Sequence, residues 1–120
     1  MPRRRILRLN ELLRTEIGEL LRRHVRDPRL SAMVSVTEVR TADDLKHAKV
    51  FVSVLGDDDE KKLAMQGLRA AHNYLRHELG NRIDRLDIPQ LAFELDDSIE
   101  RGARILAALE DDPPLPPEPS

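Results

Sequence analysis

Two clusters of basic side chains form the pattern in this sequence that points most clearly to a chemical function. The first cluster lies at the start of the chain and consists of Arg3, Arg4, Arg5 and Arg8. The second has spacings of seven, three and four residues, which place its members on one face of a helix: Lys62, Arg69, His72 and Arg76. Arg82 and Arg85 add two charges further along. Cationic side chains bind phosphate, so the two clusters together indicate contact with a nucleic-acid backbone. Each cluster alone is also compatible with an ordinary solvated helix surface.

Patterns for catalysis or metal binding are interrupted or missing. His77-Glu78 begins like a zinc-protease motif, but Asn81 stands where the second histidine belongs. The sequence has no cysteine, which excludes thiolate catalysis and cysteine-based metal sites. The acidic run 57–60 suits the start of a helix, where negative charge complements the helix dipole. We therefore predict no catalytic residue, no metal site and no cofactor.

Composition and charge describe one small domain with a charged surface. The 120 residues are 40% hydrophobic and 35% charged, with a net charge of −2. Residues 1–29 hold nine arginines and four acidic residues, whereas residues 110–120 hold four acidic residues and no basic one. This asymmetry indicates a local contact with a polyanion. There is no membrane-length apolar run and no export signal, so we expect a cytoplasmic protein.

The elements that must position these side chains can be predicted from hydrophobic periodicity. Apolar residues three or four apart predict a helix over about residues 4–25. Period-two alternation predicts a hairpin, with strands over 33–40 and 48–55. In the first strand, Val34 and Val36 are expected on one face and Val39 on the other. In the second, the alternation expected on the buried face is Ala48, Val50, Val52 and Val54.

Hydrophobic periodicity in the second half of the sequence predicts two more helical regions and one strand. The stripe that begins at Ala64 is compatible with one straight helix or with a kink at Ala71-His72-Asn73. A third strand follows, with inward-facing residues Leu91, Phe93 and Leu95, and then a last helix. Residues 110–120 are acidic and rich in proline, which predicts a disordered tail after a domain over 1–109. The order is α-β-β-α-α-β-α, an α+β fold with helices on one face of a small sheet.

Several of these segments resemble the bacterial ribosome-binding factor A family. The likeness is carried by the hairpin run 44–54, which reads DLKHAKVFVSV, and by the run 88–98, which reads IPQLAFELDDS. Gly102, Arg104-Ile105, the helix run 8–13 and the segment 27–30 also match. The resemblance covers about residues 1–109.

The resemblance implies a KH-like domain of type II, with the order α-β-β-α-α-β, a three-stranded sheet and a further C-terminal helix. Members of the family carry a kink, usually Ala-x-Gly, between the two central helices. Asn73 replaces the glycine here, and asparagine can also adopt the left-handed conformation at some cost. The resemblance also implies a monomeric, non-enzymatic factor that binds the immature small (30S) ribosomal subunit and its 16S rRNA. Such a factor assists maturation of the 5′ end of that RNA, matters most in the cold and works beside maturation GTPases.

The RNA-contacting residues predicted from these observations include the two basic clusters, Asn73 at the junction, and Lys46 and Lys49 of the hairpin. A different class of function also remains open, that of a protein-binding adaptor that uses its proline-rich tail as a ligand. A small hydrolase is disfavoured, because no nucleophile and base are paired in the sequence. Co-sedimentation with free small subunits distinguishes the assembly factor from the adaptor.

Overall fold

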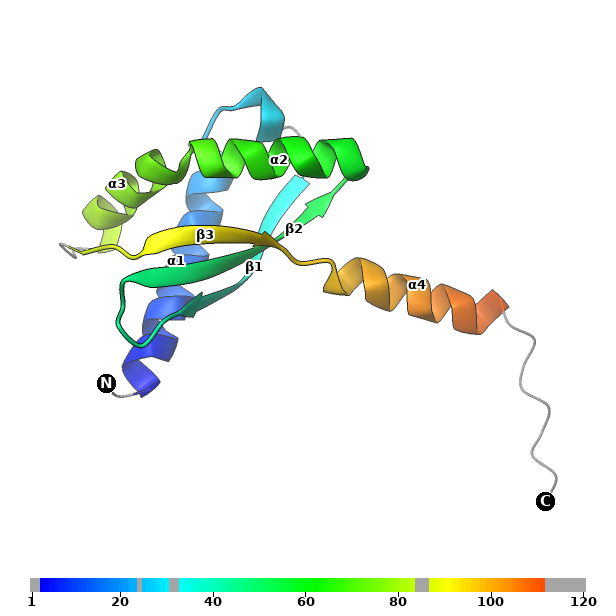
Figure 1. Ribbon diagram of the computed structural model, residues 1–120, viewed down its shortest axis with the longest axis horizontal. Helices are drawn as coiled ribbons and strands as arrows, with labels where there is room; N and C mark the ends of the chain where they lie inside the picture. The colour runs from blue at the N-terminus through cyan, green and yellow to red at the C-terminus, as the bar shows by residue number, and fades with distance from the viewer. Residues whose placement is uncertain (1–2, 24, 31–32, 84–86, 112–120) are drawn as a thin grey trace, which may run out of the picture.

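The computed structural model describes residues 3–23, 25–30, 33–83 and 87–111, and it has the α+β order expected from the sequence (Figure 1). The elements are α1 (Arg3–Arg23), a 3-10 turn η1 (Pro28–Leu30), β1 (Met33–Thr41), β2 (His47–Leu55), α2 (Asp58–Ala70), α3 (His72–Ile83), β3 (Gln90–Leu95) and α4 (Ser98–Asp111). No helix of the described residues is long and apolar enough to cross a membrane.

Three strands form one sheet in the order β1-β2-β3. β1 and β2 are antiparallel, whereas β3 runs parallel to β2 after the chain has crossed over through α2 and α3. Helices α1, α2 and α3 pack on one face of this sheet and enclose a single hydrophobic core. The expected alternation of β2 is confirmed, because its four inward residues are at most 1% exposed: Ala48, Val50, Val52 and Val54.

A β-bulge in β1 corrects one expectation from the sequence. Val36 pairs with Val52, but Glu38 pairs with Phe51, so Thr37 is the extra residue. The insertion reverses the alternation of the strand. Val39 is therefore buried in the same core that Val34 and Val36 border, whereas simple alternation had placed it on the opposite face.

The long helical region is interrupted at Ala71, between α2 and α3, so the kinked alternative is correct (Figure 1). Ala71 has φ −83° and ψ 0°, and its N–H still donates to the carbonyl of Gly67 at 3.0 Å. Asn73 lies inside α3, and Leu45 is the one non-glycine residue with positive φ among the described residues. The expected left-handed role of Asn73 is therefore wrong, because the break is made at Ala71, which has a negative φ in the bridge region.

The acidic run before α2 caps that helix. The Asp57 carboxylate accepts a hydrogen bond from the Glu60 N–H at 2.8 Å, and the Glu60 carboxylate accepts one from the Asp57 N–H at 3.2 Å. This reciprocal pair is a capping box, which satisfies N–H groups that the first helical turn leaves without partners.

The end of the chain departs from the core. Leu95 was expected to face inward, but it is 41% exposed because β3 ends there, beyond the edge of the packed region. α4 then extends away from the sheet and the other helices (Figure 1). It continues through Glu110 and Asp111, so the helix takes the first two residues of the segment 110–120 that was expected to be a tail. The rest of that segment, 112–120, lies outside the described residues.

Candidate functional site

The arginine cluster at the start of the chain occupies the first turns of α1, where it is exposed. We call it the arginine arm. Its members are Arg3, Arg4, Arg5 and Arg8. The first turn holds no acidic residue, and none of the described residues forms an ion pair with these four. Positive charge at a helix N-terminus opposes the helix dipole, at a cost of up to about 1 kcal/mol for each charge. These charges therefore do not stabilise α1, and they remain available to an external anion.

Two leucines lie beside this arginine arm. Leu7 is 52% exposed and Leu12 is 42% exposed, and both border a shallow depression together with Arg4 and Arg8. A partner that contacts the arm would also meet apolar surface there. The apolar periodicity of the sequence did not include either leucine among the buried positions of the helix, but it did not predict the depression that they border.

A second exposed basic surface lies along α2. Lys62 and Arg69 are exposed on the same side of the helix and line a groove of about 470 Å³. Met65 lies between them in the groove, and Leu95 at the end of β3 forms part of the opposite wall. No ion pair to Lys62 or Arg69 is formed by the described residues. We call this feature the α2 groove. It combines two free cations with a strip of apolar surface.

The α3 residues of the predicted basic stripe are used within the fold. The Arg76 guanidinium donates to the carbonyl of Ile88 at 2.6 Å and to that of Pro89 at 3.2 Å. The His72 Nε2 atom accepts the N–H of Leu91 at 3.1 Å. Both side chains are half-buried. They hold β3 against α3, so the structure makes them positioning residues for the strand.

The remaining predicted residues differ in their surroundings. Lys46 is exposed in the loop between β1 and β2, and Asn73 is exposed on α3. Lys49 faces Glu94 at 3.8 Å on the uncovered side of the sheet, and Arg82 pairs with Glu16 of α1 at 3.2 Å. Arg85 lies outside the described residues.

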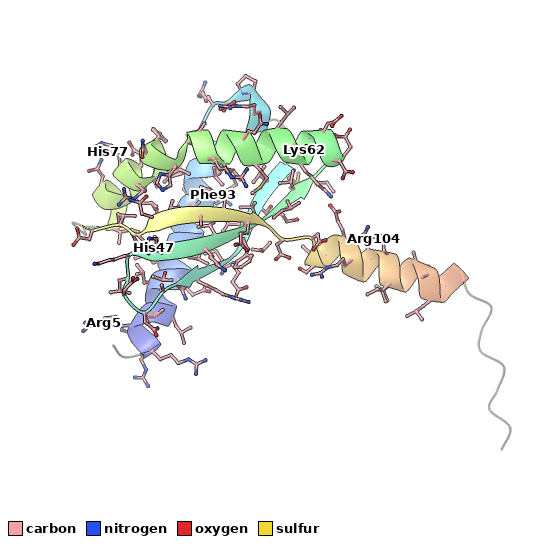
Figure 2. The ribbon with its side chains drawn as sticks, in the orientation of Figure 1. Arg5, His47, Lys62, His77, Phe93 and Arg104 are labelled. Carbon is pink, nitrogen blue, oxygen red and sulfur yellow. The ribbon has the colours of Figure 1, made fainter. Side chains whose placement is uncertain are left out.

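Figure 2 shows how widely the predicted residues are spread. Arg5 lies at the start of α1, His47 lies at the nearby end of the hairpin, and Lys62 lies at the far end of α2. Of the two basic clusters expected from the sequence, the arginine arm is exposed as a whole, whereas only the α2 part of the second cluster is exposed, at the α2 groove. Between them lie side chains that are already bonded.

The start of α4 is fixed to the body by two polar contacts. The Asp96 carboxylate accepts hydrogen bonds from the Ser98 N–H at 2.9 Å and from the Thr37 hydroxyl at 2.7 Å. Hydrogen bonding with the Ser98 side chain first, then with the Thr37 hydroxyl and the Ser98 N–H, lowers the pKa of Asp96 below its ordinary value. Lys61 of α2 adds an ion pair with Glu100 at 2.6 Å. The large apolar residues of α4 are exposed from the first turn onward: Ile99, Ile105, Leu106 and Leu109.

Comparison with known proteins gives a consistent result. A family model described as ribosome-binding factor A matches residues 5–109. Ribosome-binding factor A of Dictyoglomus thermophilum is 47% identical over 109 residues, which is 91% of each chain. The protein of that name from Halothermothrix orenii is 49% identical over 105 residues, covering 88% of this chain and 85% of its own.

Solved structures of similar fold have the same names. The crystal structure of ribosome-binding factor A from Thermus thermophilus matches with a TM-score of 0.67 and 24% identity, over 75% of this chain and 93% of its own. A Thermotoga maritima protein proposed to be a ribosome-binding factor A, solved by NMR, matches with a TM-score of 0.61 and 30% identity, over 77% and 91%. A homology model of the Thermus protein, fitted into a cryo-EM map of its complex with the 30S subunit, gives a TM-score of 0.62 at 22% identity, over 73% and 91%. The KH-like fold expected for this chain is confirmed.

Proposed function

The chain belongs to the ribosome-binding factor A family, and on this premise we propose that it binds the immature small ribosomal subunit by contacting 16S rRNA. The observation that carries the proposal is the arginine arm of α1, whose four exposed charges have no partner among the described residues. The 30S complex of the Thermus relative supports the same partner.

The mode of binding we infer is electrostatic docking combined with recognition of RNA shape. Folded RNA is recognised mainly by its shape, its backbone and its unpaired strands. The sequence contains only three aromatic residues, Phe51, Tyr74 and Phe93, and Phe93 is buried in the core. A row of stacking platforms that reads successive bases is therefore not part of the mechanism.

The biological role that follows is late maturation of the subunit in the cytoplasm. We propose that the protein acts as a monomer without catalysis, assists maturation of the 5′ end of 16S rRNA and leaves before translation starts. Its contribution would be greatest at low temperature, where misfolded RNA rearranges slowly, and maturation GTPases would act beside it.

The test is co-sedimentation of the protein with purified immature small subunits on a sucrose gradient. Reversing the charge of Arg3, Arg4, Arg5 and Arg8 to glutamate should weaken binding about tenfold or more at low salt, because four phosphate contacts are lost. The dependence of log affinity on log salt should become shallower by about four. A binding affinity of the unaltered protein that stays constant from low to physiological salt would contradict the proposal.

A matched control variant carries the same change of charge at four exposed arginines that already pair with neighbouring acidic residues: Arg14, Arg22, Arg23 and Arg40. This control should retain most of the affinity, because its arginines lie outside the arm. Circular dichroism must show that both variants fold. Equal loss in the two variants would mean that net charge, and not the arm, determines binding.

A further inference from the structure

A cavity lies where three segments of the fold meet. The loop between β1 and β2 forms one side, α3 forms the second, and the residues leading into β3 form the third. Its volume is about 610 Å³, within the range of about 300–1,000 Å³ that is typical of small-ligand pockets. The cavity is separate from both the arginine arm and the α2 groove, since it shares no lining residue with either.

The loop that forms one wall is held in a strained conformation. Leu45 has a φ of 62°, which is uncommon for a residue with a large side chain. Four hydrogen bonds hold the loop: Ala42 N–H to His47 O at 2.8 Å, Leu45 N–H to Ala42 O at 2.9 Å, Lys46 N–H to the Asp44 carboxylate at 2.9 Å, and Gln90 N–H to Lys46 O at 2.8 Å. Strained backbone of this kind is concentrated at binding sites, where it fixes the shape of a wall in advance.

Arg76 gives the cavity a fixed donor. The carbonyls of Ile88 and Pro89 each accept one N–H of its guanidinium, which leaves three of the five N–H groups without a bond to those carbonyls. An arginine that is already immobilised loses little conformational entropy when it binds a further acceptor. Lys46, exposed on the loop, adds a second cation at the same cavity.

The lining carries charges of both signs together with apolar surface. Asp44 and Asp87 place carboxylates at a cavity that also holds the two cations, and Leu45 and Ile88 contribute apolar surface. A ligand that is only anionic would be repelled by the carboxylates. A ligand that is only apolar would leave the charged groups unpaired. A ligand that satisfies the cations, the carboxylates and the apolar surface together has a flat apolar ring, with an amino group at one end and a phosphate at the other.

We propose that this cavity holds one unpaired nucleotide of the RNA that the protein binds, an inference that rests on the proposed function. The phosphate contacts Lys46 and Arg76, and the base packs against Leu45. Asp87 accepts a hydrogen bond from the exocyclic amino group of the base, because a carboxylate is an acceptor that pairs with such a donor. Adenine and cytosine carry that amino group and uracil does not, so the cavity discriminates against uracil.

The experiment is an NMR titration of the ¹⁵N-labelled full-length protein with single-stranded hexanucleotides of adenine, cytosine or uracil. The amides of Leu45, Lys46 and Gln90 should shift with the adenine and cytosine hexamers at concentrations about fivefold or more below those needed for the uracil hexamer. Asp87→Asn should abolish this preference, because the asparagine amide can accept from an amino group and can also donate to the O4 carbonyl of uracil. Equal shifts with all three hexamers would overturn the assignment of the base.

Two controls separate the cavity from the rest of the molecule. Lys46→Gln should weaken binding of every hexamer, whereas Arg104→Gln, on the exposed surface of α4, should leave hexamer binding unchanged. Adenosine monophosphate should shift the same amides only at higher concentrations. If the free nucleotide bound as tightly as the hexamer, the occupant would be a free nucleotide and not a position in an RNA chain.

The failure of this inference differs from the failure of the proposed function. A protein that co-sediments with small subunits but shows no shift at the cavity amides refutes the cavity alone. A protein that does not co-sediment refutes the proposed function, whatever the hexamers do. Asp87 is exposed, so its replacement is not expected to unfold the domain, and unchanged amide shifts elsewhere will verify this.

Discussion

Two basic side chains of the predicted stripe in α2 face solvent, whereas two in α3 bond to backbone atoms at the start of β3. Lys62 and Arg69 line an open groove, but His72 and Arg76 hold the start of the strand in place. The two helices are neighbours in sequence, and their basic residues share one helical spacing. Spacing therefore identifies the face on which a cation lies, while the partners on the adjacent strand decide whether that cation also holds the fold together.

Removing the guanidinium of Arg76 is the most direct test of this difference between the two helices. Arg76→Met keeps an unbranched stem close to that of arginine but leaves the carbonyls of Ile88 and Pro89 without their donor, and both residues are buried. The expected cost is about 1–3 kcal/mol in the free energy of unfolding. Thermal denaturation followed by circular dichroism should show a melting temperature lower by several degrees. An unchanged melting temperature would mean that Arg76 is as free as the α2 cations.

The matching change in α2 should have the opposite result. Arg69→Met removes a charge that lies in the open groove, so the free energy of unfolding should change by less than about 0.5 kcal/mol. The affinity for small subunits should fall several-fold, and the salt dependence should become shallower by about one. Sedimentation at three salt concentrations measures both quantities. A loss of stability with full affinity would place Arg69 in the same class as Arg76.

A smaller effect is expected at the junction between the two helices. Asn73 lies in α3 with a negative φ and an exposed side chain, so helix propensity should control substitution there. Asn73→Ala should raise the free energy of unfolding by about 0.5 kcal/mol, and Asn73→Gly should lower it by a few tenths. Urea denaturation resolves this order. A more stable glycine variant would restore a left-handed requirement at this position.

The smallest effect is expected at the Asp96 carboxylate, which accepts two hydrogen bonds at the start of α4. Because hydrogen bonds lower the pKa of Asp96, its contribution to stability is present above its ordinary value of 3.8 and is lost as the pH falls through the lower folded-state pKa. Thr37→Val removes one of these donors, so the pKa of Asp96 should move up toward 3.8. NMR titration of the carboxyl group follows the change. An identical midpoint in both proteins would show that Thr37 does not hold Asp96.

Much of this fold could be predicted because its signals are local. The alternation of β2 holds along the whole strand, and the stripe of α1 identifies its buried side, for example at Leu13 and Ile17. Alternation failed in β1 because the bulge at Thr37 depends on pairing with a distant strand. It failed at Leu95 because the space between that residue and α2 is left open as a groove.

The site was harder to predict for the same physical reason. Helical spacing predicts the face on which Arg69 and Arg76 lie equally well. The carbonyls that bind Arg76 are brought to it only when β3 folds beside α3. The cavity beside Arg76 also joins segments that are more than 30 residues apart in the chain. The arginine arm was found directly, because exposure at a helix N-terminus requires no tertiary partner.

The contacts that join α3 to β3 also bear on aggregation. β3 is an edge strand, and an unpaired edge can add a strand from another molecule. At the start of this edge, Pro89 has no N–H to offer, Arg76 occupies the carbonyls of Ile88 and Pro89, and His72 occupies the outward N–H of Leu91. The side chains that secure the strand therefore also block its first positions from intermolecular pairing, which protects the protein from edge-to-edge assembly at high concentration.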